Sequence, residues 1–203
     1  MNIKYGGTLK TLLVNNYLFK PSKINRLQKE IKLITGEQPK VVHISDIEGF
    51  DETKYEAIVL SGGEAPLNLP EVAETYSKVS SWIKNIKKPI LGICFGHQLL
   101  GFAFGGRVAR LSRKFEGFYE VEILNHDTIF RGLPDKITVY KSNIRVIAKV
   151  MNGFELLAKS PEQEVEAFKH IDHQIFGIQF HPENYSENYF YGRRILENFF
   201  NAL

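Results

Sequence analysis

Short apolar runs alternate with longer amphipathic stretches in the first half of the chain. Apolar residues between Pro21 and Gly36 recur at spacings of three and four, which predicts a helix ending at Gly36 (Ile24, Leu27, Ile31, Ile34). A second helix is predicted over Val72–Ile86, with apolar residues on one face. Buried strands are predicted at Leu9–Asn15, Lys40–Ile44, Ala57–Leu60 and Pro89–Ile93. Strands and helices that alternate in this way predict a parallel sheet covered by helices.

The pattern changes after about residue 106, where short apolar runs follow one another with turns between them. They predict added strands at Val108–Leu111, Tyr119–Leu124, Ile137–Tyr140, Glu155–Ala158, Glu164–Lys169 and Ile175–Phe180. A final helix is predicted over Asn188–Phe200, where apolar residues pair four positions apart. The predicted fold class is therefore α/β, in one domain over residues 1–203. It has a mostly parallel central sheet, helices on both faces and added antiparallel strands.

Composition narrows the classes of protein to consider. The 26 Lys and Arg residues nearly balance 23 Asp and Glu, and a net charge of +3 does not argue for nucleic acid. Cys94 is the single cysteine, which excludes an internal disulfide and argues against a Cys-rich zinc site. No apolar run approaches the ~18 residues of a membrane span, and Met1–Lys20 lacks the pattern of a signal peptide. We expect a soluble, cytoplasmic protein without metal or cofactor, binding neither nucleic acid nor membrane.

Cys94 lies between a predicted strand and a predicted helix, in the segment Gly92-Ile93-Cys94-Phe95-Gly96. This is the pattern of a nucleophile elbow with cysteine in the place of serine. The N-terminus of the helix favours the reactive thiolate, and the backbone N–H of Phe95 would point to where an oxyanion forms. A structural cysteine between packing glycines is the alternative interpretation, but the flanking glycines in this strand–helix context favour a nucleophile.

His181 and Glu183 end the last predicted strand, in Gln179-Phe180-His181-Pro182-Glu183. Residues two apart on extended backbone share a face, so the carboxylate can lie behind the imidazole. A carboxylate in that place fixes the tautomer of the histidine and stabilises the imidazolium, as in other catalytic triads. Alone this motif is weak, whereas together with a cysteine elbow it predicts acyl-transfer chemistry.

Taken together, these segments resemble class I glutamine amidotransferases. The resemblance spans roughly Leu12 to Phe200 and rests on Ser61-Gly62-Gly63, the elbow up to Gln98, and Phe180–Glu183, in that order and spacing. Within the class the chain is most similar to the separate glutaminase subunit of two-subunit GMP synthases, through PILGICFGHQ, FGGRVAR, IFRGLPDKITVYKS, EAFKH and IFGIQFHPE. The resemblance implies a flavodoxin-like class I amidotransferase fold and hydrolysis of glutamine to glutamate and ammonia.

The resemblance also implies a role for each matching residue. Cys94 would be the nucleophile, His181 the general acid and base, and Glu183 its orienting carboxylate. Phe95 and Gly63 would form the oxyanion hole. Glutamine would be bound by Gly62, Gly63, Gln98, Ser142 and Asn143. The ammonia would pass to a separate ATP-dependent synthetase, most similar to the type that aminates XMP to GMP.

The chain departs from the family pattern at two places, of which the first could alter the oxyanion hole and the second leaves the partner open. Glu64-Ala65-Pro66 follows the glycine pair where the family has proline directly, and Ser142-Asn143-Ile144-Arg145 stands where GMP synthase subunits have Ser-His-x-Asp. Alternative interpretations are an amidotransferase for an anthranilate or aminodeoxychorismate type of synthetase, a cysteine peptidase or γ-glutamyl hydrolase, and a non-catalytic regulatory paralogue.

Cations gather along the sequence just after the elbow helix. Four of them fall within eight residues (Arg107, Arg110, Arg113, Lys114), and Lys141 and Arg145 are expected to add two more beside the glutamine pocket. These residues are either a solvated basic face or a docking surface for a synthetase with an acidic patch.

Overall fold

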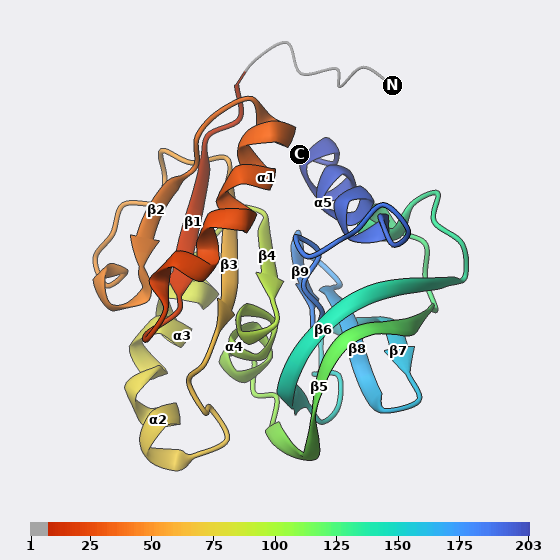
Figure 1. Ribbon diagram of the computed structural model, residues 1–203. Helices are drawn as coiled ribbons and strands as arrows, with labels where there is room; N and C mark the ends of the chain where they lie inside the picture. Colours follow the sequence, from red (N-terminus) through yellow and green to blue (C-terminus); the bar gives the residue numbers. More distant parts are fainter. Residues whose placement is uncertain (1–7) are drawn as a thin grey trace.

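The computed structural model describes residues 8–203, which form one nine-stranded sheet with helices packed against it (Figure 1). The strands are β1 (Thr11–Asn16), β2 (Lys40–His43), β3 (Ala57–Gly63), β4 (Ile90–Ile93), β5 (Val108–Ile123), β6 (Lys136–Ile147), β7 (Phe154–Ser160), β8 (Gln163–His170) and β9 (Ile175–Ile178). The helices are α1 (Asn25–Thr35), α2 (Pro70–Thr75), α3 (Ser77–Asn85), α4 (Phe95–Ala103) and α5 (Tyr191–Asn201), with short 3₁₀ turns η1 (Pro21–Ile24), η2 (Ile44–Asp46) and η3 (Thr128–Phe130).

The strand order is β2-β1-β3-β4-β9-β8-β7-β5-β6. The four pairs from β2 to β9 are parallel, and this half has the 2-1-3-4-5 order of flavodoxin-like sheets. The other four pairs are antiparallel. The sheet is thus mixed, and the prediction of a mostly parallel sheet was right only for its first half. The carboxyl ends of β1, β3, β4 and β9 meet at one edge, where ligands bind in open α/β sheets.

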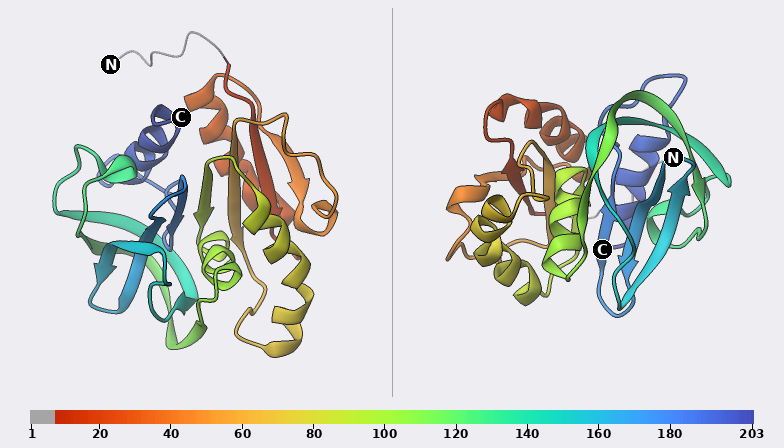
Figure 2. Two further views of the ribbon diagram at one scale, coloured as in Figure 1. Left: turned by 180° about the vertical axis from the view of Figure 1, so that it is seen from behind. Right: turned by 90° about the horizontal axis from the view of Figure 1, so that it is seen from below.

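Two apolar cores lie on opposite faces of the parallel half, as predicted. Side chains of α1 and α5 pack with one set of alternating strand residues, for example Leu13 and Val59. Side chains of α3 and α4 pack with the other set, for example Leu12 and Ile58. Figure 2 shows the two groups of helices on opposite sides of the strands. Successive side chains of β1 and β3 point to opposite faces of the sheet, and both faces are buried. This explains why these strands are apolar throughout.

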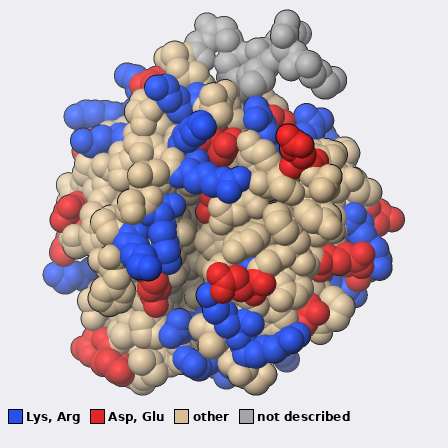
Figure 3. Space-filling view, viewed as in Figure 1, with Lys and Arg blue, Asp and Glu red and all other residues tan. Residues whose placement is uncertain are grey.

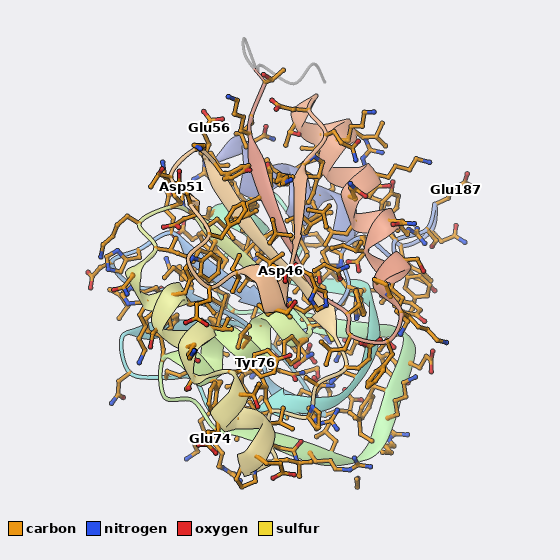
Figure 4. All side chains as sticks on the ribbon, turned by 90° about the vertical axis from the view of Figure 1, so that its left-hand side faces the viewer. Asp46, Asp51, Glu56, Glu74, Tyr76 and Glu187 are labelled. Atoms are coloured by element: carbon orange, nitrogen blue, oxygen red, sulfur yellow. The ribbon has the colours of Figure 1, made fainter. Side chains whose placement is uncertain are left out.

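The helix predicted over Val72–Ile86 is in fact two helices. They meet at Tyr76, labelled in Figure 4, whose φ and ψ of −89° and 3° interrupt the helix. The Tyr76 ring is buried and packs edge-on against Phe95 at 5.5 Å between ring centroids. The chain thus bends where an aromatic side chain turns into the core beside the elbow.

The prediction of separate short strands over Val108–Leu111 and Tyr119–Leu124 was wrong. The structure has one long strand, β5, which pairs with β6 along its length and shifts register between Arg110 and Phe115. The intervening polar residues have the composition of a turn, but their side chains are exposed on a strand. Strand β6 also continues past its predicted end at Tyr140 and carries the expected glutamine-binding segment. The last helix begins at Tyr191 rather than Asn188.

No helix within residues 8–203 is long and apolar enough to cross a membrane. The expectation about a signal peptide in Met1–Lys20 falls partly on residues 1–7, which lie outside the described residues.

Candidate active site

Cys94 lies in the tight turn between β4 and α4, at the carboxyl edge of the parallel strands. Its φ of 51° and ψ of −99° are rare for a residue with a side chain, and its N–H donates to the carbonyl of Ile178 at 2.9 Å. A Cβ on Gly92 would lie 2.6 Å from the Gly96 carbonyl oxygen, and a Cβ on Gly96 would collide with the backbone of Leu60. The two glycines therefore let the strained turn and the helix approach the neighbouring strand.

His181 follows β9 and faces the same edge. Its backbone N–H donates to the carbonyl of Tyr140 on β6 at 2.8 Å, which ties the histidine to the antiparallel half of the sheet. Its Nδ1 lies 2.8 Å from Oε1 of Glu183, and both side chains are buried. A Cβ on Gly62 would lie 2.9 Å from Cε1 of His181, so the absence of a side chain at Gly62 leaves room for the imidazole ring against β3.

The charges around His181 favour its protonated form. Burial alone would lower the pKa of His181, but the charges of Cys94 and Glu183 and the hydrogen bonds to both raise that pKa well above its usual value. Burial and the nearby charges of Glu183 and Cys94 also raise the pKa of Tyr17, so its hydroxyl stays protonated. The site can therefore present an imidazolium proton next to the cysteine sulfur.

A cavity of about 480 Å³ opens onto these residues. Most of the predicted site residues line it, namely Gly63, Cys94, Gln98, Ser142, Asn143, His181 and Glu183. Gly62 and Phe95 do not. Gly62 packs behind the cavity against His181, and the Phe95 side chain is buried, although as the first residue of α4 its N–H has no acceptor within the helix. Cys94 Sγ lies 3.9 Å from the carbonyl oxygen of Ser142.

The side-chain amide nitrogens of Gln98 and Asn143 donate hydrogen bonds within the protein. Gln98 Nε2 donates to the carbonyl of Arg145 at 2.8 Å and to Oε1 of Gln179 at 3.2 Å. Asn143 Nδ2 donates to the same Arg145 carbonyl at 3.2 Å, and its buried Oδ1 has no partner among the described residues. The side-chain amide of Asn143 is thus buried within the protein, although the residue itself lines the cavity.

Some residues of the cavity wall were missed by sequence reasoning. Tyr17 follows β1 and lines the cavity, but only its place after a buried strand could have signalled it. Glu64 accepts a hydrogen bond from the N–H of Leu18 at 3.1 Å and pairs with Lys23 at 3.4 Å. The residue that departs from the family pattern after Gly62-Gly63 therefore holds the loop after β3 against η1. Arg145 was expected beside the pocket, and it does line the cavity, where its Nε donates to Oδ1 of Asn68 at 2.7 Å.

The expectation that Lys141 adds an exposed cation beside the pocket was wrong. Lys141 is fully buried, and its ammonium group pairs with the carboxylate of Glu166. Its place on β6 explains this, because Ile137, Val139, Lys141 and Asn143 are the buried members of an alternating strand.

His97, which lies next to the elbow in the sequence, has no catalytic geometry. His97 is fully buried against Phe168, with ring centroids 4.6 Å apart, and burial lowers the pKa of His97 to about 3, so it is a neutral packing residue. Among residues 8–203, no three or more His, Cys, Asp or Glu side chains cluster in a way that could bind a metal ion.

Comparison with known proteins gives a family match over most of the chain. The model of the family described as glutamine amidotransferase class-I matches residues 20–203. The glutamine-hydrolyzing GMP synthase subunit from Methanothermobacter thermautotrophicus is 34% identical over 191 residues, which cover 94% of this chain and 96% of the relative. The same subunit from Methanosarcina acetivorans is 36% identical over 193 residues, 95% of each chain.

A solved structure is also similar over nearly the whole chain. A crystal structure from Thermoplasma acidophilum, described as that of a GMP synthase subunit, superposes with a TM-score of 0.81 at 30% identity, covering 96% of this chain and 94% of that one. The family match over residues 20–203 and the identity across full-length relatives confirm the resemblance seen in the motifs. This chain belongs to the class I glutamine amidotransferase family.

Proposed function

We propose that this chain is the glutamine-hydrolysing subunit of a two-subunit GMP synthase, with Cys94, His181 and Glu183 as its catalytic triad. The observation that carries the proposal is the convergence of a strained elbow cysteine and a carboxylate-paired histidine on one cavity. Relatives that match the chain over nearly their whole length are named as glutamine-hydrolyzing subunits of GMP synthase, which supports the choice of reaction.

In the first half of the reaction, Cys94 Sγ attacks the carbon of the glutamine side-chain amide. The C–S bond forms as the carbonyl π electrons move to oxygen, where the N–H groups of Phe95 and Gly63 stabilise the oxyanion. His181 then gives its proton to the amide nitrogen, and the C–N bond breaks to release ammonia and leave a γ-glutamyl thioester. Glu183 keeps the imidazole in the orientation and tautomer that this transfer needs.

In the second half, neutral His181 takes a proton from a water molecule as its oxygen attacks the thioester carbon. The C–S bond breaks and the pair of electrons returns to sulfur, which restores the thiolate and the imidazolium. The sum is glutamine plus water to glutamate plus ammonia, without an external oxidant or reductant. Ser142 and Asn143 line the cavity beside Cys94 and would hold the amino-acid end of the substrate largely through their backbone groups.

Glutamine hydrolysis by the purified chain, alone and with an XMP-aminating synthetase, tests the proposal. Wild type should release glutamate, and a glutamine-like diazo-ketone should alkylate Cys94 stoichiometrically. Cys94→Ser should abolish both reactions while the fold stays intact, because serine is a poor nucleophile where a thiolate is needed. Near-wild-type hydrolysis by Cys94→Ser, or labelling elsewhere, would refute the assignment, and preference for γ-glutamyl peptides over glutamine would identify a hydrolase instead.

The ammonia acceptor is proposed to be XMP on a separate ATP-dependent synthetase. This proposal rests on the names of the relatives and on cations near the cavity mouth. Lys and Arg side chains gather at the lower edge of the face shown in Figure 3, over the start of β5. A synthetase docked there would lie beside the mouth from which ammonia leaves. The test is formation of GMP from XMP, ATP and glutamine in the mixture, with anthranilate-type synthetases as the comparison.

A further inference from the structure

A buried ion pair lies directly behind the wall of the cavity. Lys141 of β6 and Glu166 of β8 are both fully buried, and the ammonium group of Lys141 contacts Oε1 of Glu166. Ser160 completes the cluster, accepting from Lys141 Nζ at 3.1 Å and donating to Glu166 Oε1 at 2.7 Å. The second oxygen of Glu166 has no partner among the described residues, so Lys141 is the main compensation for this buried carboxylate.

Stability alone does not account for such a pair. Two charges taken out of water pay a desolvation cost that their attraction only partly returns, and apolar side chains of similar volume often stabilise a core as well or better. An ion pair differs from an apolar contact in its fixed direction and distance. The cluster is therefore suited to fixing the relative position of the two strands that carry it.

Each residue of the pair is connected through the backbone to residues of the candidate active site. On β6, Lys141 stands between Tyr140, whose carbonyl accepts from the N–H of His181 at 2.8 Å, and Ser142, whose carbonyl lies 3.9 Å from Cys94 Sγ. On β8, the carbonyl of Glu166 accepts from the N–H of Gln179 at 2.8 Å. Gln179 in turn lies two residues before His181 and accepts a hydrogen bond from Gln98 at 3.2 Å.

The link also joins strands that are not neighbours. In the sheet, β7 and β5 separate β8 from β6, so no backbone ladder sets the distance between the pair-bearing strands. The sheet must curl for these side chains to meet, and their contact fixes how far β6 reaches over the elbow. Tyr140 and Ser142 point into the cavity while Lys141 points to the buried side.

We propose that Lys141 and Glu166 are positioning residues that set the distance between the glutamine-binding wall at Ser142–Asn143 and the Cys94–His181 pair. They act through the strands and do not touch the substrate. This inference rests on the proposed glutaminase function. Misplacing the wall by a fraction of an ångström should weaken glutamine binding and alignment without changing the reactivity of the sulfur itself.

The test compares Lys141→Met, Glu166→Gln and the apolar double variant Lys141→Met/Glu166→Met with wild type. KM and kcat for glutamine are measured per active site, counted by stoichiometric diazo-ketone labelling, and Cys94 alkylation by iodoacetamide reports the sulfur without needing the wall. Lys136→Met is the matched control, because Lys136 lies on the same strand in an exposed pair with Glu120 at 2.8 Å.

Lys141→Met should raise KM by about tenfold per active site, with the iodoacetamide rate within about twofold of wild type. The double variant should recover thermal stability, since it leaves no unpaired buried charge, yet keep a raised KM. Lys136→Met should match wild type. Where a single variant does not fold, the double variant decides.

A double variant with the wild-type KM would overturn the inference. So would a Lys141→Met protein with fewer active sites but a normal KM in each, because that result means the pair only stabilises the fold. A wild-type chain that neither hydrolyses glutamine nor reacts with the diazo-ketone would instead refute the glutaminase proposal on which the inference rests.

Discussion

Cys94 adopts a backbone conformation that glycine tolerates and other residues rarely adopt. Its φ of 51° and ψ of −99° lie near the first central position of a type II′ turn, where glycine dominates. We predict that Cys94→Gly is more stable than Cys94→Ala by roughly 1 kcal/mol, because alanine keeps the strain of a Cβ at positive φ. Chemical denaturation of both variants measures the difference. An alanine variant of equal or greater stability would show that the turn is not strained.

Glu183 should set the pH range of activity through His181. The imidazolium is the proposed donor of the proton that the amide nitrogen takes up before it leaves as ammonia, so activity should fall as pH rises through the pKa of His181. Glu183 helps to raise that pKa, and Glu183→Gln removes its negative charge. We therefore predict that Glu183→Gln lowers the His181 pKa and moves the alkaline limb of the kcat/KM profile to lower pH. An alkaline limb at an unchanged or higher pH would contradict this role.

Chemistry-bearing residues were predictable from sequence only where they form a local motif. Cys94 was found through its flanking glycines, and His181 through its spacing to Glu183. Tyr17 belongs to no motif and reaches the cavity only because β1 ends there. The exposure of Lys141 was predicted wrongly because a lysine is usually exposed, whereas its position in the strand indicates burial. The alternation Ile137, Val139, Lys141 already put it on the buried face, but its carboxylate partner lies 25 residues away.

The long β5–β6 hairpin is the element that turns an open parallel sheet into an enclosed site. It carries Tyr140, Ser142 and Asn143 over the carboxyl edge, where the elbow and His181 lie. Its sequence did not show this, because β5 combines charged residues with glycine and so looks like a turn. The parallel half was predictable, since buried apolar runs and amphipathic helices have distinct periods. The hairpin depends on pairing between distant residues that no local period records.

Gly117 is a point where the hairpin needs glycine. It stands opposite Lys141 in the β5–β6 register and has a φ of 127°, which other residues rarely adopt. We predict that Gly117→Ala costs about 1–3 kcal/mol of unfolding free energy and lowers glutamine turnover, because strain there distorts the wall. Urea denaturation and glutaminase assays measure the two effects, with Ser112→Ala on the same strand as control. A Gly117→Ala protein as stable as the control would rule out this strain.

At the scale of the whole molecule, Arg145 in the cavity wall stands opposite a second arginine, Arg110. Arg110 and Arg145 face each other across β5 and β6, and burial and the charge of Arg110 lower the pKa of Arg145. Within residues 8–203, neither guanidinium forms an ion pair with a carboxylate. Like charges directly opposite on paired strands are destabilising, so a carboxylate from outside would be stabilised between them.

The proposed synthetase is the partner that could supply such a carboxylate at the point where ammonia leaves. We predict that Arg145→Asp weakens activation of glutaminase by the synthetase, so that half-maximal activation needs a higher synthetase concentration. The reason is that the acidic patch of the synthetase would then face a negative charge on this chain. Hydrolysis by the chain alone should change little. Added salt should weaken activation of wild type more than that of the variant, since screening acts on the attraction that Arg145 provides.

The matched control is Lys84→Asp, which makes the same charge change on an exposed position of α3. Titrating the synthetase against the three proteins at two salt concentrations measures the effect. Identical curves for wild type and Arg145→Asp would mean that Arg145 serves only its hydrogen bond to Asn68 and that the synthetase docks elsewhere.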